Sequence, residues 1–82
     1  MKRDPIEDLT LELANVLKAR RISLGLSKNK LSQLAGVAYQ TVAFIEDAER
    51  HPTVATVARL ATAMNTTASK LINEAEKKTT KG

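Results

Sequence analysis

The sequence predicts an all-α fold, and three observations favour it. Apolar residues recur at three- and four-residue spacing along most of the 82-residue chain. They are mostly Leu, Ala, Val and Ile, without the alternation that is typical of strands. Capping residues and glycines divide the chain into segments of helical length. Because a chain of this size buries only a small core, we expect one domain over residues 1–75 and a loose polar tail over residues 76–82.

The first helix is expected from about Pro5 to Leu24. Asp4 before Pro5, with Glu7 three residues after Asp4, is an acidic capping pattern with proline at the first helical position. Gly25 can supply the left-handed residue that often closes a helix. The apolar stripe of this helix comprises Ile6, Leu9, Leu13, Val16, Leu17 and Leu24. The basic residues of its last turns either complement the helix dipole or are simply solvated: Lys18, Arg20 and Arg21.

Two short helices joined by a tight turn are expected next, which is a helix-turn-helix over about residues 28–47. Ser27 can cap the first of them and Gly36 can end it. Its buried stripe is expected to comprise Leu31, Leu34 and Ala35. The second runs from about Tyr39 to Asp47 and lacks a polar cap, because Ala38 occupies the capping position.

Two more helices complete the domain. Thr53 can cap a fourth helix, which Asn65 can close in a left-handed conformation. Its apolar stripe comprises Val54, Val57, Leu60, Ala61 and Met64. Thr67 can cap a fifth helix that we expect to end at about Ala75. The apolar contribution of that helix comes from Leu71 and Ile72.

The second helix of the helix-turn-helix has two different sides at about 100° per residue. The side expected to pack gathers Thr41, Val42, Ile45 and Glu46. The side expected to face water gathers Tyr39, Gln40, Ala43 and Phe44. The chain has one Tyr and one Phe, and both fall on the water-facing side, where burial gives them no return. We infer that this side has a partner.

The charge balance suits a polyanionic partner. The net charge is +4 and the isoelectric point is near 9.7, values that fit either nucleic-acid binding or ordinary solubility. The absence of cysteine excludes disulfides and thiolate metal sites. Met1 begins no apolar signal region and no stretch is long enough to span a bilayer, so we expect a cytoplasmic protein that does not enter membranes.

The residues for catalysis are missing. His51 is the only histidine, so the chain has neither a catalytic triad nor a multi-histidine metal site. No glycine-rich phosphate loop is present, and the carboxylates suit helix caps and solvated faces: Glu7, Asp8, Glu12, Asp47 and Glu49. We expect no enzyme, no catalytic residue, no metal and no cofactor.

Over about Leu13 to Ile72 the chain resembles the lambdoid-phage repressor and Cro-like (Xre-type) helix-turn-helix family. The residues that carry the resemblance, in order, are Arg21, Gly25-Leu26-Ser27, Leu31, Leu34-Ala35-Gly36-Val37, Val42, Ile45-Glu46, Pro52, Leu60-Ala61 and Leu71. The resemblance implies a compact five-helix, repressor-like domain whose third helix enters the major groove of double-stranded DNA. It also implies a homodimer on a two-fold site.

The resemblance places the base-reading positions on Ala38, Tyr39, Gln40 and Phe44, with Ala43 on the same face. Gln40 has the donor and acceptor for a bidentate contact with adenine, and Ala43 and Phe44 can meet thymine methyl groups. Tyr39 can reach a base or a phosphate. Alternatively, Phe44 folds back over the edge of the domain or lies in a protein interface, and Gln40 only solvates the surface.

Lys28 stands at the start of the second helix, where the family often has Gln. A lysine there is unfavourable for the helix dipole, which makes more sense if a phosphate lies nearby. Further backbone contacts are expected from Asn29, Lys30, Thr41 and Arg50. Each of these residues is alternatively a solvated surface group.

Arg21 and Glu46 correspond to a partly buried, structural ion pair that ties the first helix to the end of the third in some relatives. Alternatively, they are two unpaired surface charges. Two positions depart from the family pattern: Ala48 replaces the usual Gly after the third helix, and Ala38 replaces Ser or Thr. If Ala48 is left-handed, the backbone carries about 1 kcal/mol of strain. Alternatively, the loop has a different shape.

The sequence therefore predicts a homodimeric transcriptional regulator, most simply a repressor that occludes a promoter. A phage repressor, a restriction-modification controller and an antitoxin all fit this size. The competing hypothesis is a protein-interaction module. In that case Tyr39, Phe44 and the long first helix would hold a protein partner, such as a toxin or an effector, without DNA specificity. Separately, the surplus apolar residues Leu9, Leu11 and Leu13 of the first helix suit an additional dimer contact.

Overall fold

The computed structural model describes residues 4–79 and confirms the all-α prediction. Within these residues the chain forms five helices and no strand. The helices are α1 (Pro5–Ser23), α2 (Lys28–Ala35), α3 (Tyr39–Glu46), α4 (Val54–Ala63) and α5 (Ala68–Thr79). Every helix in this part of the chain is too short or too polar to be a transmembrane span.

Four helices begin at the predicted side-chain caps. The capping oxygen accepts a hydrogen bond from a backbone N–H two or three residues later, at 2.9 Å for Asp4, 3.0 Å for Ser27, 3.1 Å for Thr53 and 3.2 Å for Thr67. The remaining helix, α3, begins after Ala38, whose side chain makes no capping hydrogen bond. The start of α3 is therefore held by main-chain hydrogen bonds to the carbonyl of Ala38 and by packing, without a side-chain cap.

Four residues with positive φ end the helical segments. Gly25 and Gly36 have φ of 72° and 70°, and Asn65 has 58°, as the sequence predicts. Ala48 has φ of 57°, so the left-handed alternative is the one that the chain adopts after α3. An alanine is strained at this φ because of its Cβ atom, whereas a glycine would adopt the same φ without strain.

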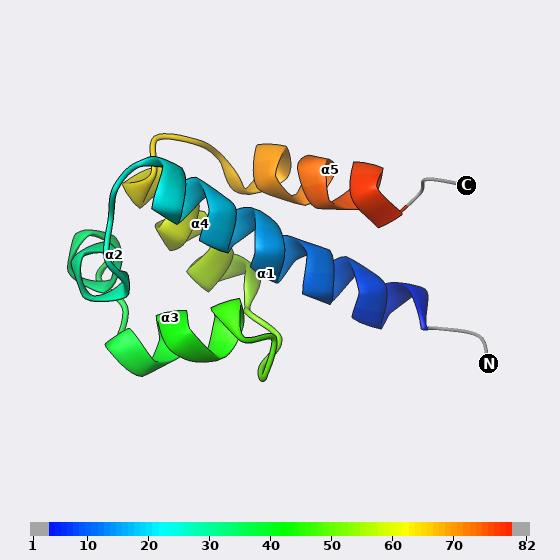
Figure 1. Ribbon diagram of the computed structural model, residues 1–82, viewed down its shortest axis with the longest axis horizontal. Coiled ribbons are helices and arrows are strands. Elements are labelled where there is room, and N and C mark those ends of the chain that lie inside the picture. The colour runs from blue at the N-terminus through cyan, green and yellow to red at the C-terminus, as the bar shows by residue number, and fades with distance from the viewer. Residues whose placement is uncertain (1–3, 80–82) are drawn as a thin grey trace.

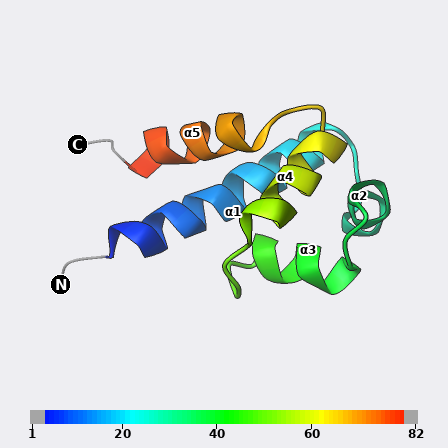
Figure 2. The ribbon, with the colours of Figure 1, turned by 180° about the vertical axis from the view of Figure 1, so that it is seen from behind.

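The core lies between the five helices, and α1 packs mainly against α5 and α3. Figure 1 shows α1 as the long axis of the molecule, with α5 running antiparallel beside it and α2 and α3 at one end. In front in Figure 2 is α4, which packs against α2 and α5. The largest fully buried side chains come from α1, α2, α3, α4 and α5 together: Leu17, Leu31, Leu60, Met64, Leu71 and Val42. Every helix therefore contributes to one core.

The predicted tail is wrong over residues 76–79, because α5 continues to Thr79. Glu and Lys are good helix formers, and Lys77 and Lys78 in the last turn complement the helix dipole. The hydroxyl of Thr79 also donates to the carbonyl of Glu76 at 2.9 Å. The remaining tail, residues 80–82, lies outside the described residues.

Some residues of the predicted apolar stripes are exposed instead of buried. The side chains concerned are Ile6, Leu24, Leu34 and Val54. In α2, Leu34 is 53% exposed, and Ser32 is buried beside Leu31 in its place. Burial of this hydroxyl is tolerated because it donates to the carbonyl of Asn29 at 2.7 Å. Ile6 and Val54 belong to first helical turns, beyond the edge of the core.

Candidate nucleic-acid interface

One side of α3 is buried and the other faces solvent. Val42, Ile45 and Glu46 are buried where α3 packs against α1 and α2. At about 100° per residue, the direction opposite this stripe falls between Gln40 and Phe44. Gln40 is exposed and Phe44 is half-buried. The short helix is thus held from behind and presents its outer side to solvent.

The outer side of α3 is narrower than the sequence suggests. Tyr39 lies two helical turns before Glu46, which places it on the same side of the helix as that buried carboxylate. It is 49% exposed and contributes electrostatically to the environment of Arg21. Thr41 and Ala43 are half-buried at the flanks. Tyr39 therefore lies at the edge of the exposed face, and Ala38, which precedes the helix, is fully at the surface.

Phe44 has an intramolecular partner. The guanidinium carbon of Arg50 lies 4.6 Å from the centroid of the Phe44 ring, within the range of a cation–π contact. Of the alternatives for Phe44 considered from the sequence, the geometry resembles the one in which the ring is covered by the edge of its own domain. The structure brings these two residues together, a pairing that the sequence reasoning missed.

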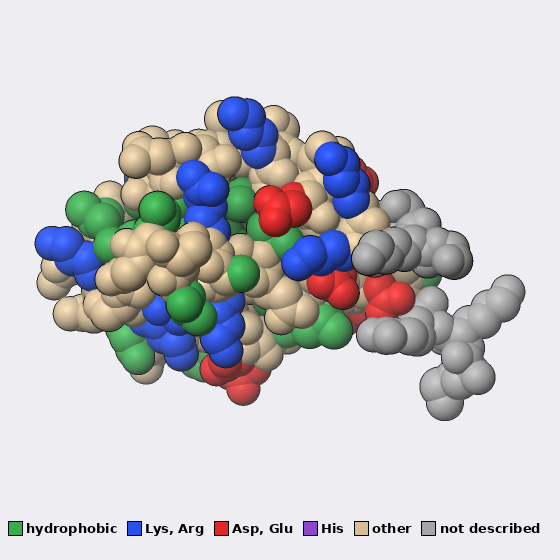
Figure 3. Space-filling view, turned by 45° about the horizontal axis from the view of Figure 1, so that its top comes forward, with side chains coloured by type: hydrophobic (Ala, Val, Ile, Leu, Met, Phe, Trp, Pro, Cys, Tyr) green, Lys and Arg blue, Asp and Glu red, His purple; other side chains and the backbone are tan. Residues whose placement is uncertain are grey.

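The residues expected to contact the DNA backbone all reach the surface. Lys28 and Thr41 are half-buried, whereas Asn29, Lys30 and Arg50 are exposed. The first turn of α2 contains no acidic residue. In Figure 3 the left end of the molecule, which α2 forms, shows Lys or Arg side chains and no Asp or Glu. The sequence of α2 itself contains two lysines and no acidic residue, so this helix is positively charged.

Arg21 and Glu46 form the ion pair that the resemblance implies. Nε and Nη2 of Arg21 donate to the two carboxylate oxygens of Glu46 at 2.7 and 3.0 Å, and Nη1 donates to the carbonyl of Leu26 at 2.7 Å. The hydrogen bond to Glu46 raises the pKa of Arg21, against the opposing effect of desolvation. Arginine is protonated throughout the physiological pH range, so Arg21 keeps its charge there with or without this shift.

Arg20 has a structural role that the sequence reasoning missed. Its Nε and Nη2 donate to the carbonyl of Met64 at 2.9 and 2.8 Å, and Nη2 also reaches the carbonyl of Asn65 at 3.3 Å. These carbonyls belong to the C-terminal end of α4, where backbone acceptors lack helical partners. The only signal in the sequence was an arginine near the end of a helix, which does not reveal its distant acceptors.

His51, expected on the loop surface, pairs with α1. Its Nε2 lies 3.0 Å from Oε1 of Glu7, and both side chains are largely exposed. An exposed pair of this kind contributes little to stability. The contact nonetheless links the loop after α3 to the first turn of α1.

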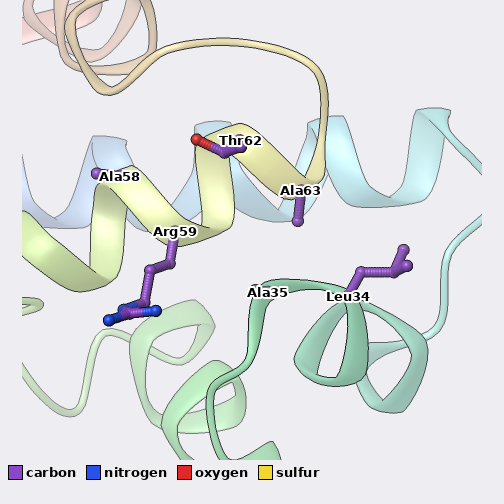
Figure 4. A pocket seen from close by; sticks show the side chains of 6 residues that line it. All are labelled: Leu34, Ala35, Ala58, Arg59, Thr62 and Ala63. Carbon is purple, nitrogen blue, oxygen red and sulfur yellow. The ribbon is translucent and has the colours of Figure 1, made fainter.

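The described residues offer little else for a small ligand. Among residues 4–79, no group of three or more His, Cys, Asp or Glu side chains could hold a metal ion. An open groove of about 440 Å³ lies between α2 and α4, where Figure 4 shows Leu34 and Arg59 projecting from opposite walls. Its other lining residues are small: Ala35, Ala58, Thr62 and Ala63.

Comparisons with known proteins find matches over most of the chain. The profile of the helix-turn-helix family HTH_3 matches residues 17–71. The fold is similar to a solved structure described as an HTH_3 family transcriptional regulator from Vibrio cholerae, with 31% sequence identity and a TM-score of 0.76. That match covers 90% of this chain and 42% of the other, so this chain spans less than half the length of that relative. No curated protein matches this chain.

Proposed function

The chain belongs to the helix-turn-helix family HTH_3, and from this premise we propose that it is a sequence-specific, DNA-binding transcriptional regulator that acts as a repressor. In this proposal α3 is the recognition helix and lies in the major groove of double-stranded DNA. The similar solved structure is described as a transcriptional regulator, which supports the same activity here.

The two sides of α3 carry the proposal. Val42 and Ile45 pack into the core, and Glu46 is held by Arg21, so the helix is rigidly placed. Gln40 projects from the opposite side and is free to contact a ligand. A helix held in this way can enter the major groove, which is wide enough to admit it.

Each group of surface residues then has a role. We assign base contacts to the exposed side of α3 and the residue before it: Ala38, Tyr39, Gln40 and Ala43. Phe44, which the resemblance also places among the base-reading positions, is in contact with Arg50. Gln40 is the residue suited to adenine, because its amide can donate and accept at once. We assign phosphate contacts to the residues that flank this face: Lys28, Asn29, Lys30, Thr41 and Arg50. The contacts of the second group add affinity without sequence preference.

A homodimer in the cytoplasm completes the proposal. Helix-turn-helix proteins of this kind read two half-sites related by two-fold symmetry, about one helical turn apart. Two copies of α3 would then contact successive major grooves, and a bound dimer would block a promoter. No catalytic step and no cofactor are part of this function.

Selection from a pool of random duplexes tests the proposal. The protein is expected to enrich one motif with two-fold symmetry, with affinity that falls as the salt concentration rises. Lys70→Ala is a matched control, because Lys70 is exposed on α5, away from α3. Enrichment of no motif would contradict sequence-specific binding and favour the alternative, a protein-interaction module or antitoxin.

A further inference from the structure

We infer that Phe44 is a positioning residue: its ring holds the guanidinium of Arg50 where it contacts a DNA phosphate, and Phe44 itself does not read a base. This inference rests on the proposed DNA binding and changes the role given to one residue of the recognition helix. The observation behind it is the 4.6 Å stack of Arg50 over the ring.

The backbone after α3 places Arg50 over Phe44. Ala48 is left-handed, and its N–H donates to the carbonyl of Ile45 at 3.0 Å. The N–H of Glu49 then donates to the carbonyl of Phe44 at 2.9 Å, so the chain folds back over the last turn of the helix. The next residue is Arg50. The stack is therefore set by main-chain hydrogen bonds as well as by attraction between the two side chains.

The guanidinium remains available to a ligand. Over residues 4–79, Arg50 makes the ring contact and forms neither a hydrogen bond nor an ion pair with a protein acceptor. A ring lying under the flat face of a guanidinium leaves the N–H edge open. That edge matches two oxygens of a phosphate. Because the ring already restricts the side chain, less conformational freedom is lost on binding.

Position along α3 favours phosphate over a base as the ligand. In helix-turn-helix complexes the N-terminal residues of the recognition helix contact base edges. Phe44 belongs to the last turn of α3 (Tyr39–Glu46), and Arg50 follows the end of the helix. A space of about 140 Å³ beside the pair is lined by polar Thr41, Thr53 and Thr56 together with apolar Ile45 and Pro52. This end of the helix therefore suits the sugar–phosphate backbone.

The stack is tested first in the free protein, by NMR. Protons of the Arg50 side chain are expected to show upfield ring-current shifts in the wild type and in Phe44→Tyr. Phe44→Leu should remove these shifts. Tyr39→Leu, which changes the only tyrosine, should leave them in place. Shifts that are absent from the wild type, or that survive in Phe44→Leu, would overturn the inference without any DNA present.

The role in binding is tested on the duplex that the wild-type protein selects. Arg50→Ala is expected to lower the salt slope by about 0.9, the effect of one phosphate contact. Phe44→Leu should weaken all duplexes by the same factor, about two- to tenfold, because the unrestrained Arg50 side chain must then be ordered on binding. Phe44→Tyr should restore wild-type binding. In the Arg50→Ala background, Phe44→Leu should have no further effect.

Two other outcomes have distinct meanings. If Phe44→Leu alters the preference at one base pair, or still weakens binding when Arg50 is alanine, then Phe44 contacts DNA itself and the inference fails. If the wild-type protein selects no motif at all, the proposed DNA-binding function fails. Circular dichroism of each variant confirms that the compared proteins are folded.

Discussion

Both carboxylate oxygens of Glu46 accept hydrogen bonds from the guanidinium of Arg21, at 2.7 and 3.0 Å. The two side chains are buried, with 10% and 2% of their surfaces exposed. Arg21 belongs to the last turns of α1 and Glu46 is the last residue of α3. The pair therefore ties α3, the helix that we propose enters the major groove, to the longest helix of the domain.

Glu46→Ala should destabilise the protein by about 3 to 5 kcal/mol, because it leaves the buried charge of Arg21 without a partner. The double variant Arg21→Met/Glu46→Leu should lose much less, since neither charge then remains. Urea unfolding followed by circular dichroism measures both. If the double variant is as unstable as Glu46→Ala or worse, the cost comes from lost packing and not from an unpaired charge.

Arg20→Ala should lower the free energy of unfolding by about 1 to 2 kcal/mol, because the carbonyls of Met64 and Asn65 lose their charged donor. Lys18→Ala, an exposed change on the same helix, should alter stability by less than about 0.5 kcal/mol. Thermal and urea unfolding compare the two variants. Equal effects would show that Arg20 does not stabilise the end of α4.

Ala48→Gly should stabilise the protein by about 0.5 to 1 kcal/mol. Relief of the left-handed strain exceeds the greater freedom of glycine in the unfolded chain. The same change at Ala58, which is exposed in the middle of α4, should destabilise by about 0.5 to 1 kcal/mol. The measurement is the sign of the change in the free energy of unfolding for each of the two variants. A loss of stability at both positions would contradict strain at Ala48.

Gln40→Ala should relax the preference at one base pair of the selected duplex and cost about 1 to 3 kcal/mol on that duplex. Binding to duplexes with substitutions at each position gives the preference. Gln33→Ala removes the same side chain from the exposed side of α2 and should leave the preference unchanged. Uniform weakening on every sequence would mean that Gln40 contacts no base.

Lys28→Ala should weaken all duplexes alike and lower the slope of log affinity against log salt by about 1. The loss follows from one fewer phosphate neutralised near the start of α2. Lys70→Ala on α5 is the matched control and should keep the wild-type slope. An unchanged slope for Lys28→Ala would remove this residue from the set of phosphate contacts.

Local signals predicted most of the fold. Each capping oxygen and each left-handed residue acts within a few positions of its own place in the chain, so Ser27, Gly36 and Thr53 marked the helix boundaries from sequence alone. The buried stripe of α3 also followed from spacing, because Val42 and Ile45 are separated by nearly one turn. These features depend on residues that are close together in the chain, so the sequence alone reveals them.

Contacts between distant segments were harder to predict. Arg20 and its acceptor Met64 are 44 residues apart, and no local pattern links them. Ser32 replaces Leu34 in the core because a hydroxyl can bond to its own helix, which periodicity does not register. The last turn of α5, residues 76–79, was not predicted, because the polar residues of a helix resemble those of a tail. The exposed face of α3 was predicted only in part, because Ala43 and Phe44 are half-buried, and the contact of Arg50 with Phe44 was not predicted.

The pairing of α1 with α5 has a consequence for synthesis of the chain. Of the described helices, α1 leaves the ribosome first and α5 last, and each covers apolar surface of the other. At about 5 to 20 residues per second, α1 waits several seconds for that cover. During this interval the nascent protein displays Leu13 and Val16, so its vulnerability to proteases and chaperone capture should end only when residues 68–79 emerge.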